Sequence, residues 1–145
     1  MTSDDDVRRR RLRADLINQR WGSGSDERMR RLARAFPSLA DATGVDPWNL
    51  HQLMRWALTA NLPRGATHAV RFVLQVWDPD LDWRSEAVRA GLCTPAEARR
   101  ADHPLSSFNF ADAFAVWDGG DRDAVVAWCE LPFRVGDPAT GRRIR

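Results

Sequence analysis

The sequence predicts an all-α fold, a single compact domain of about six to eight short helices packed as an orthogonal bundle. Apolar residues recur at helical spacing along most of the chain, and capping residues, prolines or glycines stand at the ends of these segments. No strand pair or hairpin signal accompanies them. With 43% apolar residues and seven tryptophans in 145 residues, the chain can bury one core. We expect this domain to span residues 1–133 and residues 134–145 to form a loose basic tail.

The first predicted element is a peripheral arginine-rich helix over residues 7–21. In "DDDVRRRRLRADL", three aspartates precede five arginines that fall within six residues. On a helical wheel the arginines lie on all sides, and apolar residues lie on two: Val7, Ala14, Ile17 and Trp21 on one, Leu12 and Leu16 nearly opposite. The aspartates suit a helix N-terminus but would repel phosphate. We therefore expect a lightly docked helix that serves as a contact arm rather than as a nucleic-acid arm.

Three helices are predicted between residues 25 and 59. "DERMRRLARAF" has an apolar face, with Ser25 or Asp26 as its cap and Pro37 as its end. "PSLADATG" predicts a short helix that stops at Gly44. The third helix has Asp46 as its cap and Pro47 in its first turn. Its core stripe consists of Leu50, Leu53, Met54, Ala57 and Leu58.

Residues 66–77 can be interpreted in two ways. Four apolar residues alternate as in a strand, but Val73 and Trp77 break the alternation. We predict a central buried helix, because its neighbours are helical and a lone strand has nothing to pair with. This helix would expose a polar stripe of His68, Arg71 and Gln75.

Further helices are predicted in the second half of the chain. One begins at an Asp82 cap and stops at Gly91, and a short one has a capping box from Thr94 to Glu97. Another carries its apolar residues on one face: Phe110, Ala113, Phe114 and Trp117. The last is capped by Asp121 and ended by Pro132.

Charge is unevenly distributed along the chain. Residues 1–72 carry 13 arginines and 8 acidic residues, a net charge of +5, whereas residues 73–133 carry 5 arginines and 11 acidic residues, a net charge of −6. Residues 134–145 add 4 arginines and one aspartate, or +3. Such polarity can steer a charged partner or favour self-association.

The sequence offers no recognisable catalytic residues, metal ligands or cofactor motif. None of the three histidines (His51, His68, His103) has a catalytic partner at a known spacing, and we expect His68 to be a satisfied structural residue. Asp78, Asp80 and Asp82 imitate the opening of a calcium loop, but the glycine and glutamate that this loop requires are missing. We therefore predict that the protein is not an enzyme and that it holds no metal or cofactor.

The two cysteines, Cys93 and Cys129, are far apart and form no CxxC motif. We expect both to be buried as small apolar residues and to remain unlinked, as in a reducing compartment. No stretch approaches the roughly 18 apolar residues of a membrane span, and no signal segment is visible. These features predict a cytoplasmic protein without a membrane partner.

Residues 39–58, "LADATGVDPWNLHQLMRWAL", resemble the helix-turn-helix of bacterial transcriptional regulators. Ala40 stands at the close approach of two helices, Gly44 makes the turn, and the following apolar residues would hold the second helix. The resemblance implies that residues 47–57 form a recognition helix. Its DNA contacts would come from Asn49, His51, Gln52 and Arg55, with Arg30, Arg31 and Arg34 from the preceding helix on the same positive face.

The same segment supports a second hypothesis. Trp48, Gln52, Arg55 and Trp56 lie away from the core stripe, and tryptophan and arginine are enriched in the energetic centres of protein interfaces. We expect these four side chains to form a contiguous, partly exposed binding surface. The function predicted first is therefore that of a non-enzymatic protein acting through contacts with another protein or with its own copies. The alternative is a helix-turn-helix protein that binds nucleic acid.

Overall fold

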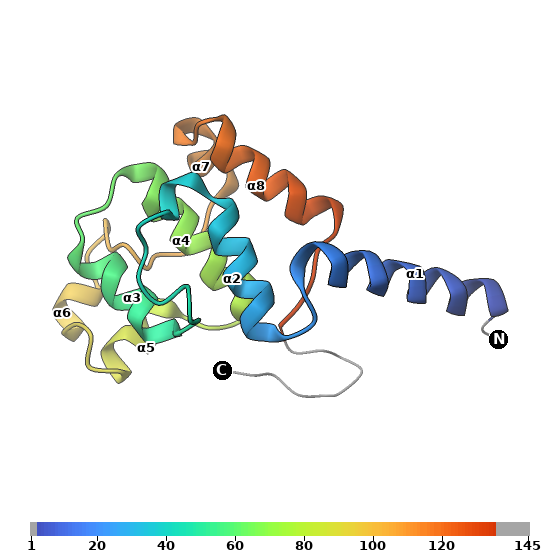
Figure 1. Ribbon diagram of the computed structural model, residues 1–145. Coiled ribbons are helices and arrows are strands. Elements are labelled where there is room, and N and C mark those ends of the chain that lie inside the picture. The colour runs from blue at the N-terminus through green and yellow to red at the C-terminus, as the bar shows by residue number, and fades with distance from the viewer. Residues whose placement is uncertain (1–2, 136–145) are drawn as a thin grey trace.

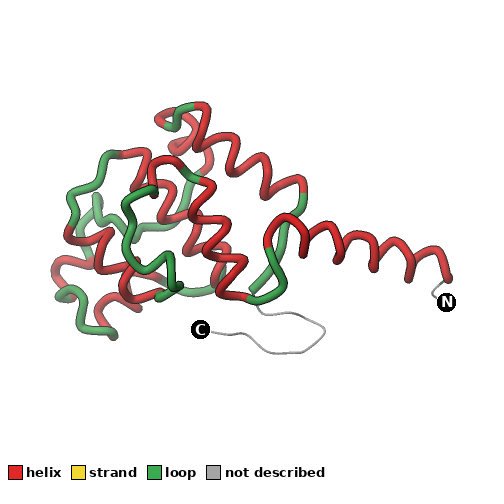
Figure 2. The backbone as a smooth tube through the Cα atoms, viewed as in Figure 1, coloured by secondary structure: helices red, strands yellow, loops and turns green. Residues whose placement is uncertain are grey.

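A computed structural model describes residues 3–135 and contains eight α-helices and one 3₁₀ helix, without a strand in this part of the chain (Figures 1 and 2). The predicted all-α single domain is thus confirmed. The elements are α1 (Asp4–Trp21), α2 (Ser25–Ala35), η1 (Pro37–Leu39), α3 (Leu50–Thr59), α4 (Arg64–Trp77), α5 (Trp83–Arg89), α6 (Pro95–Ala98), α7 (Phe110–Val116) and α8 (Gly119–Glu130).

Helix α4 is the centre of the domain and confirms the helical prediction for residues 66–77. It packs against α2, η1, α3 and α7, and buries eight of its side chains. The predicted polar stripe is wrong in part. Only Gln75 is exposed. His68 is buried as a structural residue, but its Nδ1 has no hydrogen-bond partner, so the expectation that it is satisfied is wrong for this nitrogen. Arg71 is half-buried and donates to the carbonyl oxygens of His103 and Pro104, each at 3.0 Å.

Packing continues past the predicted domain boundary at residue 133. Phe133 and Val135 are each 4% exposed, and the ring of Phe133 lies 5.6 Å from that of Trp21. The predicted tail is therefore wrong for residues 134–135, because Val135 belongs to the core. The rest of the predicted tail, residues 136–145, lies outside the described residues.

Two predicted helix starts are three residues away from the observed ones. Helix α3 begins at Leu50 and not at residue 47, because the Asn49 side chain accepts the Gln52 N–H at 3.1 Å and takes the cap position predicted for Asp46. Helix α8 begins at Gly119, where Asp118 accepts the Asp121 N–H at 3.1 Å. The cap of α2 is Gly24, so neither Ser25 nor Asp26 serves as predicted.

The helix predicted from "PSLADATG" is wrong, because only Pro37–Leu39 form a 3₁₀ helix and the residues after it form turns. Gly44 stops this segment as expected, with a φ of +82°. A Cβ atom at this position would lie 2.4 Å from the Leu53 nitrogen. The glycine therefore lets the turn approach the first turn of α3.

Several predicted helix ends are confirmed. Asp82 caps α5, and Gly91 follows its last turn with a φ of +75°. The capping box of α6 is present, since Thr94 and Glu97 each accept the other's backbone N–H. Local side-chain chemistry is sufficient at these positions.

Helix α1 projects from the body of the domain (Figure 1). Trp21 is its buried residue, and the indole Nε1 donates to the Leu131 carbonyl at 2.9 Å. Arg20 donates to the Ala127 carbonyl at 3.1 Å and pairs with Glu130 at 3.2 Å. The last turn of α1 is thus anchored beside the end of α8.

Candidate functional site

The surface predicted from α3 and the residue before its cap is only partly available. Gln52 and Arg55 are exposed, and their side chains form no hydrogen bond or ion pair within residues 3–135. Trp48 and Trp56 are half-buried and pack against the core. The ring of Trp48 lies 5.5 Å from that of Trp77, and its Nε1 is buried without a partner. The aromatic part of this surface therefore contributes mainly to packing.

The residues predicted to contact DNA have other roles in the fold. Asn49 caps α3, and the Nε2 of His51 lies 3.2 Å from Glu86. Glu86 also pairs with Arg89, and this hydrogen bond holds the pKa of the Glu86 carboxyl below its usual range, assisted by His51. Gln52 and Arg55 are the two recognition-helix candidates whose side chains bind none of the described residues.

The three arginines of α2 that were predicted to lie on the DNA-binding face also bind within the protein. Arg31 pairs with Glu27 at 2.6 Å and donates to the carbonyls at the end of α1. Arg34 donates to the Ala40 carbonyl at 3.0 Å, and Arg30 lies 4.0 Å from Glu27. Helix α2 packs mainly against α1, α4 and α8, and α3 packs mainly against α4. Arg31 and Arg34 therefore join α2 to its neighbours, whereas the contact of Arg30 lies within α2 itself.

The exposed part of α1, residues 4–16, is the strongest candidate for a contact surface, and we refer to it as the arm. Val7, Leu12 and Leu16 are 40%, 57% and 49% exposed, and they are three of the five large apolar side chains exposed in residues 3–135. The arm also presents arginines that form no ion pair or side-chain hydrogen bond with the described residues: Arg8, Arg9, Arg10, Arg11 and Arg13.

Local interactions hold the arm helical. The Ser3 hydroxyl accepts the Asp6 N–H at 3.2 Å, and three aspartates lie at the positive end of the helix dipole. An isolated helix shorter than about 12–15 residues is only marginally stable in water. An unsupported helix that exposes apolar side chains is typical of a segment that packs against a partner.

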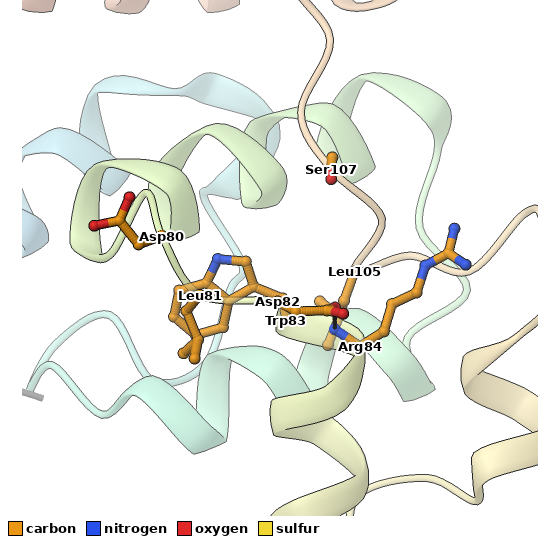
Figure 3. A pocket seen from close by; sticks show the side chains of 7 residues that line it. All are labelled: Asp80, Leu81, Asp82, Trp83, Arg84, Leu105 and Ser107. Atoms are coloured by element: carbon orange, nitrogen blue, oxygen red, sulfur yellow. Dashed lines mark hydrogen bonds between the residues drawn. The ribbon is translucent and has the colours of Figure 1, made fainter.

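Two shallow depressions flank Arg84 on α5. One of about 450 Å³ is lined by seven residues, which Figure 3 shows spread around it rather than converging on one point. The other, of about 620 Å³, shares Asp82 and Arg84 with the first depression and is also lined by Arg99. Arg84 donates to the Ser106 hydroxyl at 2.5 Å and to the Ala98 carbonyl at 3.3 Å, and Asp82 caps α5. These polar groups hold the loop after α6 in place.

A cysteine–histidine contact lies beneath the same loop. The Sγ of Cys93 is 3.7 Å from Nε2 of His103, and the Leu105 N–H donates to Nδ1 at 3.1 Å. This places the imidazole proton on Nε2, toward the sulfur. Burial raises the pKa of the Cys93 thiol and lowers the pKa of His103. The pair therefore favours a neutral thiol and a neutral imidazole, and not an activated thiolate nucleophile.

The segment that contains α6 brings Cys93 and His103 together, and no spacing in the sequence predicts this contact. Cys93 is half-buried, but Cys129 is exposed, so the expectation that both are buried is wrong for Cys129. Both are free thiols.

The described residues contain no group of three or more histidine, cysteine, aspartate or glutamate side chains arranged to hold a metal ion. Within the same part of the chain, no helix combines the length and apolar character needed to cross a membrane.

Comparisons of the chain with protein-family models, curated proteins and solved structures find no match. The functional proposal therefore depends on the chemistry of the exposed surfaces, above all that of the arm.

Proposed function

We propose that this protein is a non-enzymatic interaction protein and that the arm is the segment that binds its protein partner. The observation that carries the proposal is the exposure of Val7, Leu12 and Leu16 on a projecting helix, beside arginines that have no partner among the described residues. Apolar side chains combined with arginine are characteristic of protein interfaces. Binding would cover the apolar groups and pair the guanidinium groups with acceptors.

The composition of the arm favours a protein over a membrane surface or nucleic acid. Val7 lies about 140° around the helix from Leu12, so the arm lacks the single apolar face of an interfacial membrane helix. Three aspartates at its N-terminal end oppose phosphate. Leu12 and Leu16 are one turn apart and form a compact apolar strip that a groove on another protein can cover.

DNA binding through α3 is the alternative function, and the exposed Gln52 and Arg55 are the observation in its favour. Both side chains can bind base edges. It has less support than the arm, because the remaining candidate residues act as caps or hold helices together.

Site-specific photo-crosslinking in the native host tests both functions. A photoreactive amino acid at Leu12 should yield covalent adducts with protein. The matched control is the same substitution at Asp102, whose side chain is 81% exposed. Asp102 comes shortly after α6 in the chain, and α6 lies on the opposite side of the body from the arm (Figure 1). Adducts to protein from position 12 and not from position 102 are expected. Equal yields from both positions, or adducts to nucleic acid alone, would overturn the proposal.

A further inference from the structure

Helix α8 presents an exposed acidic face, which we define by Asp123, Val126 and Glu130. These residues are three and four positions apart and so lie on one side of the helix. Val126 is 48% exposed. Asp123 is exposed and forms no ion pair with the described residues, and Glu130 pairs only at the surface, with Arg20 at 3.2 Å. The α8 face thus has an apolar centre between two carboxylates.

One side of the arm carries the complementary groups, arginines and leucines. Arg13 and Leu16 each lie four residues or fewer after Arg9 and Leu12, so the four residues follow one another along the same side of α1 in the order Arg9, Leu12, Arg13, Leu16. All four side chains are exposed. Apolar residues can therefore meet Val126 while the guanidinium groups reach Asp123 and Glu130.

The arm cannot reach the α8 face of its own chain. The two helices meet where Arg20 binds Glu130 and the Ala127 carbonyl, and from there they diverge (Figure 1). Because α1 is one continuous helix, Arg9 is carried about 18 Å along the axis from Trp21, at about 1.5 Å per residue. The α8 face is thus open to an arm from another molecule.

We propose that the arm of one copy of this protein binds the α8 face of a second copy, and that the reciprocal contact closes a two-fold dimer. This inference depends on the function proposed for the arm and names its partner. Charge complementarity supports it, because the two arginines of the arm can face the two carboxylates of the α8 face. A two-fold dimer forms the contact twice and doubles the buried surface.

Reciprocal charge reversal tests the dimer. One variant carries Arg9→Glu and Arg13→Glu, and the other carries Asp123→Arg. The first variant places like charges across both contacts, so its dimer dissociation constant at low ionic strength should rise at least about tenfold. The second variant reverses one of the two carboxylates and leaves Glu130 in place, so its dissociation constant should rise by a smaller factor. Mixed together, the two variants form a heterodimer in which one contact is wild-type and the other brings the introduced glutamates to the introduced arginine, so dimerisation should return in part. Sedimentation equilibrium measures each constant, and fluorescent labelling of one variant identifies the heterodimer.

The matched control is Asp102→Arg, which makes the same charge change on an exposed residue outside both surfaces and should leave the dimer unchanged. Circular dichroism checks that each variant is folded. Raising the ionic strength should weaken the wild-type dimer.

Three results would overturn the inference: a wild-type protein that stays monomeric at about millimolar concentration and low salt, a dimer that survives both reversals, or a mixture that fails to restore it. The proposed function fails separately. Protein adducts from position 12 that contain only other proteins would leave the arm as an interaction segment while removing the second copy as its partner.

Discussion

Gly44→Ala should be among the most destabilising single-methyl additions in this domain. Gly44 has a φ of +82°, and a Cβ atom there would lie 2.4 Å from the Leu53 nitrogen and 2.6 Å from the Asn49 oxygen. Both contacts are with backbone, so a side-chain rotation cannot relieve them. The same backbone groups form two hydrogen bonds, from Asn49 N–H to the Gly44 carbonyl at 2.7 Å and from Leu53 N–H to the Asn49 carbonyl at 3.1 Å.

The expected loss has two components. A left-handed conformation costs a non-glycine residue about 1–2 kcal/mol. Moving the turn away from α3 weakens the two hydrogen bonds, each worth about 1 kcal/mol. The free energy of unfolding should therefore fall by about 3–4 kcal/mol in total. Gly91→Ala is the matched control, because Gly91 has a φ of +75° but nothing within 4 Å of an added Cβ. It should lose only the conformational component, about 1–2 kcal/mol.

Urea unfolding, followed by tryptophan fluorescence and circular dichroism, measures the free energy of unfolding of both variants, and thermal unfolding measures their melting temperatures. In a domain of this size the melting temperature should fall by roughly 10 °C for Gly44→Ala and by roughly 4 °C for Gly91→Ala. Equal losses at the two positions would refute the reasoning, since they would show that the close approach of the turn to α3 adds nothing to the conformational cost.

Three further perturbations test the anchor, the arm and a buried carboxyl group. Trp21→Phe should lower the free energy of unfolding by about 1–2 kcal/mol, because the Leu131 carbonyl loses its donor. Leu12→Ala should change the free energy of unfolding by less than about 0.5 kcal/mol. Urea unfolding compares the two variants, and a large loss for Leu12→Ala would mean that the arm is packed. Burial raises the pKa of Asp121, although the Ser38 N–H opposes this. A group whose pKa is higher in the folded state than in the unfolded state stabilises the fold only while it is protonated. Its full contribution to the free energy of unfolding is present below the unfolded-state pKa, about 3.9, and is lost as the pH rises through the folded-state pKa. Wild type should therefore lose stability relative to Asp121→Asn as the pH rises above about 3.9, and a relative gain in unfolding titrations would contradict this.

Much of the helical architecture could be predicted because local and tertiary preferences agree. Helix α4 is apolar around most of its circumference, and it occupies the centre where such a helix can be covered on all sides. The caps at Asp82 and Thr94 satisfy helix N–H groups through their own side chains. At these positions the residues nearest in sequence supply the deciding interactions.

Prediction failed where two local choices compete and distant contacts select one. Asp118 and Asp121 are three residues apart, and either can cap a helix. The fold uses Asp118 because Asp121 is buried, where its carboxylate accepts the Ser38 N–H at 3.2 Å. Ser38 is distant in sequence, so no local pattern could reveal the choice. The same limit applies to the contact between Cys93 and His103, which depends on the path of the chain through and after α6.

The arm shows how such distant contacts can create a binding surface. A helical wheel of α1 places apolar residues on two sides and cannot tell which side the body covers. The fold attaches α1 through its last turn, where the Trp21 indole binds the Leu131 carbonyl and packs on Phe133. The body covers neither side of the arm, so Val7 on the side of Trp21 is exposed like Leu12 and Leu16 on the other side. Apolar groups that are left out by the geometry of the anchor, among unpaired arginines, become available to a partner. The interaction surface thus follows from how α1 is attached. A weaker attachment at Trp21 should make the arm more mobile relative to the body, while the arm keeps the same exposed side chains.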